Sequence, residues 1–304
     1  MSNSTFRERW ALIANPASGG GKKRRLMDKV AGHLREAGCL PEVLWTTRRG
    51  HAEELARQAA KEGFAKIVAC GGDGTIHEIV NGIMSSRSST GAVTLGIVPT
   101  GTGNDLAREL RIPTGLSGSV NTLLNGKVNF IDLGKAGDRY FHTVATLGFS
   151  AAVSRYAMNN KLPGIFPAAA VYLYAALMTL FRYQAVTVRL NGDLDAFEGP
   201  VFLAAVGNTK CYGGGMKIAP SAVIDDGRLN LCLVRQLSRL KVARMLPRVF
   251  SGRHTKCSEV SMHRFGRMEV MTKEPVDIWA DGEFVARTPA VFQIIPHALP
   301  VLTP

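Results

Sequence analysis

The chain has 304 residues, of which 46% are hydrophobic and 32 are glycine. This is long enough for two domains and typical of a folded α/β protein, so it excludes a disordered chain. The formal net charge of +13 indicates acidic partners, which include nucleic acid, anionic lipid and phosphates, and does not choose among them.

Cysteine usage and the N-terminus favour a cytoplasmic protein. The five cysteines contain no Cys-x-x-Cys pair, which argues against disulfides and zinc and for a reducing compartment. No long apolar segment opens the chain, so we expect no signal peptide.

The chain opens with a strand, a glycine-rich loop and a helix. Residues 10–14 form an apolar run, and Leu26, Val30 and Leu34 recur at helical spacing after the loop. The loop is not a Walker A loop, because Lys22 is followed by Lys23 and the upstream glycine is missing. Basic residues at a helix start oppose its dipole, which favours a bound anion; a plain turn with a basic helix start is the alternative.

The most constrained stretch is Gly-Gly-Asp-Gly-Thr at 71–75, between an apolar strand at 67–70 and apolar residues at helical spacing from 76 to 83. Its glycines leave no Cβ between the backbone amides and a ligand, and the helix start adds N–H groups, so we expect a phosphate there. The Asp73 carboxylate would repel a phosphate. A bound Mg²⁺ would reconcile the two.

Strands and helices alternate through the first 127 residues. Residues 43–47 and 93–98 are interpreted as strands and 50–63 as a helix. The loop after 93–98 is not a dinucleotide fingerprint, because Leu106 stands where the last glycine should be. The alternation predicts a doubly wound parallel sheet, with the three glycine loops at the carboxyl ends of its strands, where ligands bind.

A β-rich second domain is expected from residue 128. Turn signals such as Asn191-Gly192 and Asp226-Gly227 separate short apolar runs, at 130–133, 140–144, 186–190, 201–206, 229–234 and 268–271. The predicted fold class is therefore α/β with two domains: a doubly wound α/β domain at 1–127 and a β-rich domain at 128–290.

Two segments of the second domain are predicted to be helices. Residues 162–181 carry no charge, but Pro163, Gly164 and Pro167 interrupt their start. The remaining 168–181 is too short to cross a bilayer, which favours a core or lipid-facing helix. Residues 238–252 combine apolar and basic side chains, which fits a helix on an anionic membrane surface or a solvated helix face.

Blocks along almost the whole chain resemble the soluble diacylglycerol kinase family of bacterial lipid kinases. They are Asn15-Pro16-x-Ser18-Gly19, Gly71-Gly72-Asp73-Gly74-Thr75 with Glu78, Asn81 and Gly82, Pro99-x-Gly101-Thr102-Gly103-Asn104-Asp105, Ile131-Asp132, Gly213-Gly214-Gly215-Met216, Pro220, Asp225-Asp226-Gly227 and Asp281-Gly282-Glu283.

The resemblance implies that 1–127 is a doubly wound nucleotide-binding domain, to which residues 291–304 would return, and that 128–290 is a β-rich sandwich domain that takes the lipid acceptor. It also implies a set of ATP contacts in the first domain. One of these ATP contacts is assigned to Thr46, but the neighbouring Thr47 is an alternative for it. His77 stands where many relatives carry asparagine. ATP would be held by Asn15, Ser18, Gly19, Thr46, Gly71, Gly72, Asp73, Gly74, Thr75, Ile76, His77, Glu78 and Thr102.

The resemblance also implies acidic residues with three roles. Asp73 would work with Mg²⁺, supported by Asp105 and Asp132 through water. The proton acceptor would be Asp281 or Glu283. A structural metal would bind Asp226 and the backbone carbonyls of Val223 and Arg228.

The predicted function is an ATP- and Mg²⁺-dependent lipid kinase that acts on diacylglycerol, with phosphatidylglycerol, a ceramide or a sphingoid base as other acceptors. A kinase of a soluble acceptor such as NAD is one alternative, against which the apolar helix and the basic helix argue. A basic membrane or nucleic-acid binder without activity is another; no basic stripe interleaved with aromatic residues supports nucleic acid as a partner. We expect peripheral association with the inner face of the membrane. The sequence does not decide between a monomer and a homodimer.

Overall fold

The structure is a computed structural model that describes residues 8–16, 21–86, 93–160 and 168–304. It divides into two compact units, Met1–Ile131 with His297–Pro304, and Asp132–Pro296. The chain passes from one unit to the other within strands β5 (Lys127–Ala136) and β15 (Ala290–Thr303). Both boundaries lie a few residues after the expected ones at 127 and 290.

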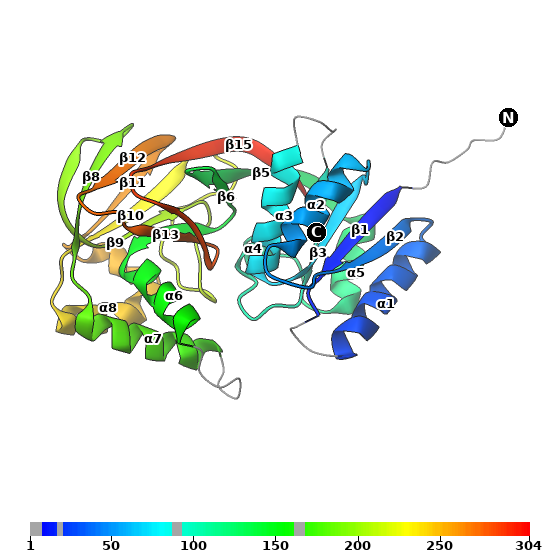
Figure 1. The fold of residues 1–304 in the computed structure, drawn as a ribbon, viewed down its shortest axis with the longest axis horizontal. Coiled ribbons are helices and arrows are strands. Elements are labelled where there is room, and N and C mark those ends of the chain that lie inside the picture. Colours follow the sequence, from blue (N-terminus) through cyan, green and yellow to red (C-terminus); the bar gives the residue numbers. More distant parts are fainter. Residues whose placement is uncertain (1–7, 17–20, 87–92, 161–167) are drawn as a thin grey trace. The chain divides into compact units, whose positions relative to one another are not determined.

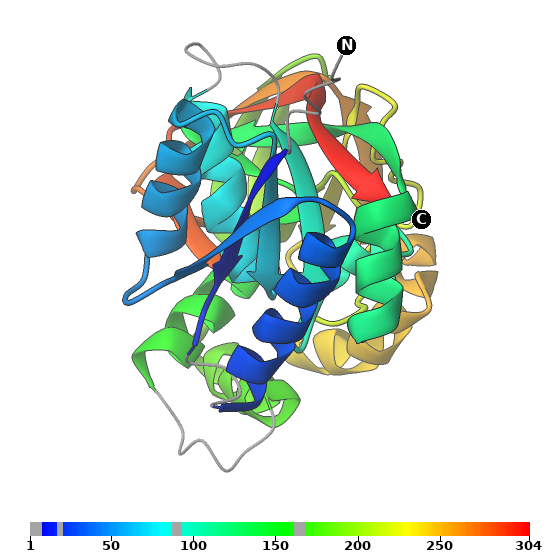
Figure 2. The ribbon, with the colours of Figure 1, turned by 90° about the vertical axis from the view of Figure 1, so that its right-hand side faces the viewer.

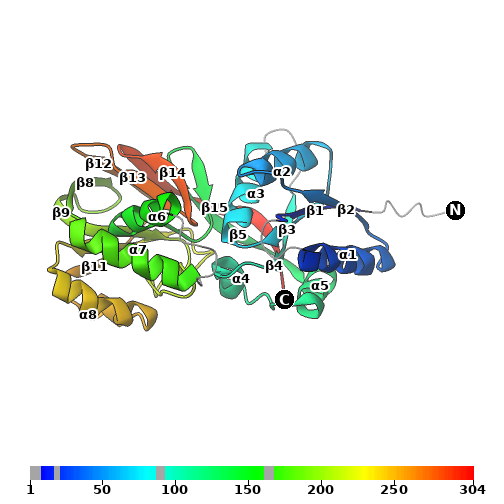
Figure 3. The same ribbon diagram turned by 60° about the horizontal axis from the view of Figure 1, so that its bottom comes forward.

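The first unit is built on parallel strands in the order β15-β4-β3-β1-β2. Helices cover both faces of this sheet, with α1 and α5 on one and α2 and α3 on the other (Figures 2 and 3). The predicted doubly wound architecture is thus confirmed. Its elements are β1 (Arg9–Ala14), α1 (Gly21–Glu36), β2 (Leu40–Trp45), α2 (His51–Lys61), β3 (Lys66–Gly71), α3 (Asp73–Ser86), β4 (Thr94–Pro99), α4 (Asp105–Glu109) and α5 (Leu116–Asn125).

Small residues let α2 and α3 approach each other closely. The buried face of α2 consists of Ala52, Ala56, Ala59 and Ala60. A Cβ on Gly82 of α3 would lie 2.4 Å from the Glu53 carbonyl oxygen and 2.8 Å from the Ala56 Cβ. Any larger residue at Gly82 would push the two helices apart.

The second unit consists of antiparallel strands that form a β-sandwich, with helices beside it (Figure 1). Its first apolar core holds Phe141, Phe265 and Phe292. Its remaining elements are β6 (Arg139–Phe141), β7 (Val144–Gly148), α6 (Phe149–Asn159), α7 (Ala168–Arg182), β8 (Val186–Gly192), β9 (Phe197–Gly207), β10 (Leu229–Arg235), α8 (Arg239–Phe250), η1 (Arg253–Lys256), β11 (Val260–Phe265), β12 (Arg267–Thr272), β13 (Asp277–Ala280) and β14 (Glu283–Arg287).

The two predicted helices of this unit are confirmed as α7 and α8. Together with α6 they pack on a second apolar core that includes Phe149, Ala175 and Val242. Among the described residues, no helix is long and apolar enough to cross a membrane. The interrupting residues Pro163, Gly164 and Pro167 lie outside the described residues.

One predicted strand is wrong in its extent. The apolar run 140–144 splits into β6 and β7, which leaves His142 and Thr143 between them. The backbone N–H groups of these two residues donate to the Asp281 carboxylate, at 3.1 and 2.9 Å. A side-chain acceptor far along the chain therefore replaces strand pairing at this point.

Candidate functional site

Four turns leave the first unit's sheet at the same edge. Strands β1, β2, β3 and β4 run parallel, with Ala14 in register with Cys70 and Gly71 with Pro99. The turns that begin at Asn15, Thr46, Gly72 and Thr100 therefore all start at the carboxyl ends of neighbouring strands. This is the edge at which open α/β sheets bind ligands.

Two of these turns touch through their glycines. A Cβ on Gly101 would lie 2.4 Å from the Cα of Gly72, and one on Gly72 would lie 3.0 Å from the Cα of Gly101. The Asn104 side chain closes the second turn, because its Oδ1 accepts from the Gly101 amide at 3.0 Å and its Nδ2 donates to the Gly101 carbonyl at 2.8 Å. The result is a surface of bare backbone from two strands, which suits close approach by phosphates.

Thr100 belongs to this edge, although the sequence analysis gave it no role. Its Oγ1 is buried and has no hydrogen-bond partner among the described residues. Its amide donates to the Gly71 carbonyl at 3.0 Å, which ties the two glycine turns together. Its position directly after β4 could have indicated a place at this edge. Its contact with the Gly71 turn, almost thirty residues upstream, depends on the fold and could not be predicted.

Two carboxylates occupy the first positions of α3 and α4. The Asp73 Oδ1 accepts from the Leu106 amide at 3.3 Å. Asp105 is buried and pairs with Arg108, whose Nη1 lies 2.5 Å from its Oδ1. Carboxylate oxygens are ligands that Mg²⁺ prefers, so the donor type fits this ion.

A metal at this edge would need further oxygens. Among the described residues, no group of three or more His, Cys, Asp or Glu side chains could hold a metal ion. Mg²⁺ is commonly held by one or two carboxylates together with substrate phosphates. Asp73 and Asp105 are two carboxylates of the kind that such an arrangement uses.

The second half of the Gly71–Glu78 stretch faces the protein interior. Ile76 and His77 are buried, with 0% and 1% of their surface exposed, so their side chains are turned away from solvent. The Glu78 carboxylate accepts from the amides of Gly50 and Ala52, at 2.9 and 3.0 Å, at the start of α2. Glu78 thus fixes the segment that follows Thr46.

The remaining predicted cofactor contacts are spread around the same edge. Thr46 is buried and its amide donates to the Ala14 carbonyl at 2.9 Å, whereas Thr47 is exposed and its amide donates to the His51 Nδ1. Asn15 follows β1 directly, and Thr102 is exposed. Ser18 and Gly19 lie outside the described residues.

A cysteine and a lysine lie beneath the turns. Burial raises the pKa of the Cys70 thiol to about 12, although the Lys23 ammonium acts in the opposite direction. Burial also lowers the pKa of Lys23, which is only 4% exposed. Cys70 is therefore a protonated core residue and not a nucleophile.

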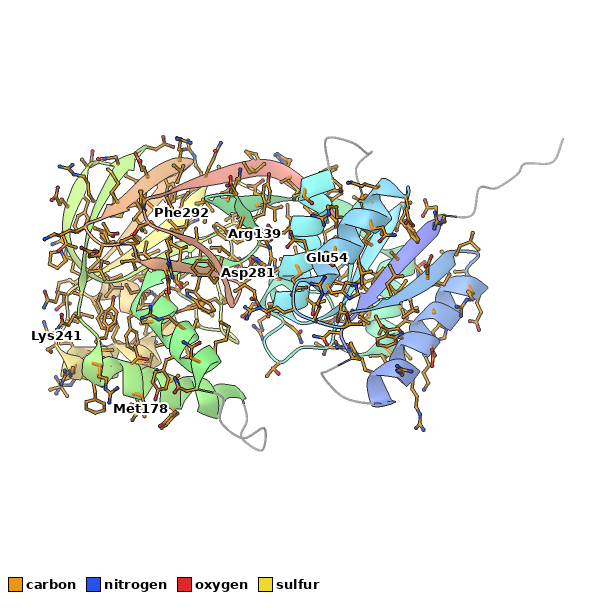
Figure 4. All side chains as sticks on the ribbon, viewed as in Figure 1. Glu54, Arg139, Met178, Lys241, Asp281 and Phe292 are labelled. Carbon is orange, nitrogen blue, oxygen red and sulfur yellow. The ribbon has the colours of Figure 1, made fainter. Side chains whose placement is uncertain are left out.

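In the second unit, Asp281 is enclosed by donors. It lies in the turn between β13 and β14 with a φ of 53° (Figure 4), and its side chain is fully buried. Its Oδ1 accepts from the Thr143 amide at 2.9 Å and the Thr143 hydroxyl at 2.5 Å, and its Oδ2 accepts from the His142 amide at 3.1 Å. The His142 Nε2 lies 3.5 Å from the same Oδ2.

Glu283 differs from Asp281 in its surroundings. It begins β14, opposite Ala280, and is partly exposed. Of the two predicted carboxylates, Asp281 therefore holds the hairpin against the segment between β6 and β7, and Glu283 is the more accessible to an acceptor.

The predicted structural metal ligands surround a turn at 223–228. Asp132 accepts from the Gly227 amide at 2.6 Å, and Asp226 accepts from the Arg228 amide at 3.0 Å. The other Asp226 oxygen accepts from an Arg264 guanidinium nitrogen at 2.5 Å. A metal bound through Asp226 would therefore compete with Arg264, and this site stays a prediction.

Comparison with known families decides what this arrangement belongs to. Residues 9–136 match the diacylglycerol kinase catalytic domain, and residues 143–303 match the YegS C-terminal NAD kinase beta sandwich-like domain. A diacylglycerol kinase of Staphylococcus saprophyticus is 30% identical over 299 residues, which cover 98% of this chain and 96% of that protein.

The chain belongs to the diacylglycerol kinase family. A diacylglycerol kinase of Staphylococcus haemolyticus is 31% identical over 96% of this chain and 87% of its own length. A crystal structure of a diacylglycerol kinase from Bacillus anthracis has the same fold, with a TM-score of 0.75 at 19% identity over 99% of this chain and 98% of that one. The family resemblance seen in the sequence is thus confirmed.

Membership of the diacylglycerol kinase family establishes the class of reaction. The protein is a lipid kinase, which transfers phosphate to a hydroxyl group.

Proposed function

We propose that the protein transfers the γ-phosphate of ATP, with Mg²⁺, to the hydroxyl of diacylglycerol in a membrane. The observation that carries this proposal is the contact between the Gly72 and Gly101 turns beside Asp73. Phosphoryl transfer requires mainly that phosphates be held and their charge be neutralised. Bare backbone amides at a helix start supply the first requirement.

The residues of the first unit would divide the work of binding. Those that hold ATP are Asn15, Ser18, Gly19, Thr46, the Gly71–Thr75 turn, Thr102 and, from the structure, Thr100. Ile76 and His77 face the protein interior, and Glu78 fixes the start of α2. Asp73 would hold Mg²⁺, with Asp105 acting through water. Bound Mg²⁺ supplies positive charge against the phosphate oxygens.

Glu283 is proposed as the proton acceptor for the lipid hydroxyl, and Asp281 as a positioning residue. The three hydrogen bonds to Asp281 support this division, because they occupy both of its oxygens. A carboxylate that removes a proton must be accessible to the hydroxyl. Glu283, which is partly exposed, meets that condition.

A lipid acceptor is favoured by the apolar side chains on α7 and α8. Phe181, Leu240 and Phe250 have 61%, 60% and 54% of their surface exposed, the three largest exposed fractions among the large apolar residues that the structure describes. Arg239 joins the two helices, since its Nη2 donates to the Phe181 carbonyl at 2.6 Å. We define the α7–α8 face as Leu177, Phe181, Leu240, Leu246, Phe250, Arg239, Arg244 and Arg248.

The α7–α8 face has the composition of a surface that docks on an anionic bilayer. Apolar side chains would enter the interfacial layer, and each basic residue near the surface would contribute about 1 kcal/mol. A soluble acceptor such as NAD, suggested by the description of the second matched domain, would require no such face.

Asp73→Asn tests the proposal. It should lower the rate of diacylglycerol phosphorylation in mixed micelles by about 10²-fold or more, because a carboxylate that binds the metal is lost. Asp28→Asn on the exposed side of α1 removes the same charge and should leave the rate unchanged. Activity of Asp73→Asn within a few-fold of wild type at saturating Mg²⁺ would contradict the proposal.

A further inference from the structure

A groove of about 260 Å³ lies between α6 and α7, within the second unit. Its α6 side has helical spacing, so one face of that helix lines it. None of the described residues that line it is acidic; they are Ala152, Arg155, Tyr156, Asn159, Asn160, Met178, Thr179, Arg182 and Tyr183. Met178 marks the α7 side in Figure 4.

Two hydroxyls among the lining residues are buried without a hydrogen-bond partner in the described part of the chain. They are the Oγ1 of Thr179, a residue only 9% exposed, and the hydroxyl of Tyr183. The Tyr183 ring is fixed edge-on against Phe149 and Phe202, with ring centroids 5.5 and 5.4 Å away. Buried polar groups are nearly always satisfied, so the Thr179 hydroxyl, which makes no hydrogen bond to the described residues, is available to a bound ligand.

The charge of the groove is positive. Arg155 and Arg182 both line it. Arg155 has one carboxylate nearby, Asp277 at 3.3 Å, but that carboxylate also binds the Arg287 guanidinium at 2.8 Å. One carboxylate shared by two guanidiniums does not cancel the charge of Arg155, and Arg182 adds a second cation.

We propose that this groove binds the phosphodiester headgroup of an anionic phospholipid, with Arg155 and Arg182 at the phosphate and the Thr179 hydroxyl donating to a headgroup oxygen. Guanidinium groups are suited to phosphate. A lipid is favoured over a free phosphate because α7 lines the groove and also carries the exposed Leu177 and Phe181. An apolar helix that enters the interfacial layer brings its own arginines to the level of the headgroups.

The proposal rests on the membrane docking in the proposed function and is independent of phosphoryl transfer. Binding of the full chain, without ATP, is measured on vesicles of phosphatidylcholine with and without phosphatidylglycerol, at high salt so that general surface attraction is screened. Arg155→Gln with Arg182→Gln should weaken the binding that depends on phosphatidylglycerol by more than about tenfold.

Matched variants separate the groove from net charge. Arg189→Gln with Arg267→Gln removes two exposed charges from the strands and should keep binding within about twofold of wild type. Thr179→Val preserves shape and removes the hydroxyl, and should weaken the same binding several-fold without a change in thermal stability.

The competing sources of phosphate are distinguished by a soluble competitor. Glycerophosphoglycerol should displace the vesicles only at concentrations far above that of the lipid, and inorganic phosphate should not displace them. Three results would overturn the proposal. The first is an equal loss of binding in both double-arginine variants, and the second is wild-type binding by Arg155→Gln with Arg182→Gln. The third is displacement of the vesicles by inorganic phosphate at low concentration. Loss of kinase activity with intact binding would leave it standing and contradict the proposed function instead.

Discussion

At Gly101 the backbone of a neighbouring turn occupies the space that a methyl group would need. We therefore expect Gly101→Ala to destabilise the first unit by about 1–3 kcal/mol, since neither backbone can move away cheaply, and to weaken ATP binding. Gly32→Ala in α1 is the matched control, because a Cβ there meets nothing within 4 Å. It should stabilise the helix by about 0.5–1 kcal/mol. Urea unfolding and ATP titration measure both effects, and equal behaviour of the two variants would contradict the close contact.

The two carboxylates of the β13–β14 hairpin should respond differently to neutralisation. Asp281→Asn keeps a residue that tolerates the positive φ, but loses an acceptor for the amides of residues 142 and 143, so unfolding should become easier by about 1–3 kcal/mol. Glu283→Gln should change stability by less than about 0.5 kcal/mol and lower lipid phosphorylation by about 10²- to 10⁴-fold, with ATP affinity unchanged. If Glu283→Gln phosphorylates lipid at the wild-type rate, the proton acceptor lies elsewhere.

Residue-level contacts were predictable where they are local in sequence. The glycines at 71–74 and 101–103 predict exposed backbone amides without any other information. Asp73, which stands among them, predicts a metal ion. The carboxylate of Glu78 binds amides 26 and 28 residues upstream, and that of Asp281 binds amides almost 140 residues upstream. Such pairings depend on the folded topology, so no pattern in the sequence specifies them.

Helix α8 is the element on which membrane association should depend most clearly. Arg244→Gln with Arg248→Gln should weaken binding to anionic vesicles at moderate salt by roughly tenfold or more, at about 1 kcal/mol for each residue. The exposed strand arginines Arg189 and Arg267 provide a matched pair of substitutions with a small effect. Flotation with vesicles of graded anionic content measures the difference. If the loss is the same for both pairs, only net charge matters.

Elements with a strong period or a long apolar run were predictable, and their interruptions were not. An uncharged apolar run predicted α7, and the combination of apolar and basic residues predicted α8. The alternation of strands and helices predicted the parallel sheet. The run 140–144 has the composition of one strand, yet it is split because two of its amides bind Asp281. Here a side-chain acceptor overrides β-propensity.

For the whole molecule, one chain contributes two kinds of chemistry. The first unit, Met1–Ile131 with His297–Pro304, offers bare backbone and carboxylates of the sort that bind nucleotide phosphates and Mg²⁺. The second, Asp132–Pro296, offers a hairpin carboxylate and a basic, apolar helical face. Any kinase with an alcohol acceptor needs the nucleotide-binding groups and a proton acceptor. The basic, apolar helical face is the part that only a membrane acceptor requires.

The central claim is that the acceptor is a membrane lipid, and one measurement tests it most directly. The full chain is incubated with ATP labelled at the γ-phosphate, Mg²⁺, and diacylglycerol, phosphatidylglycerol, ceramide and a sphingoid base in separate mixed micelles, each with NAD in the aqueous phase. We predict label in the lipid extract of the diacylglycerol sample and none in NAD. Label in NAD, or in no lipid of the panel, would contradict the account.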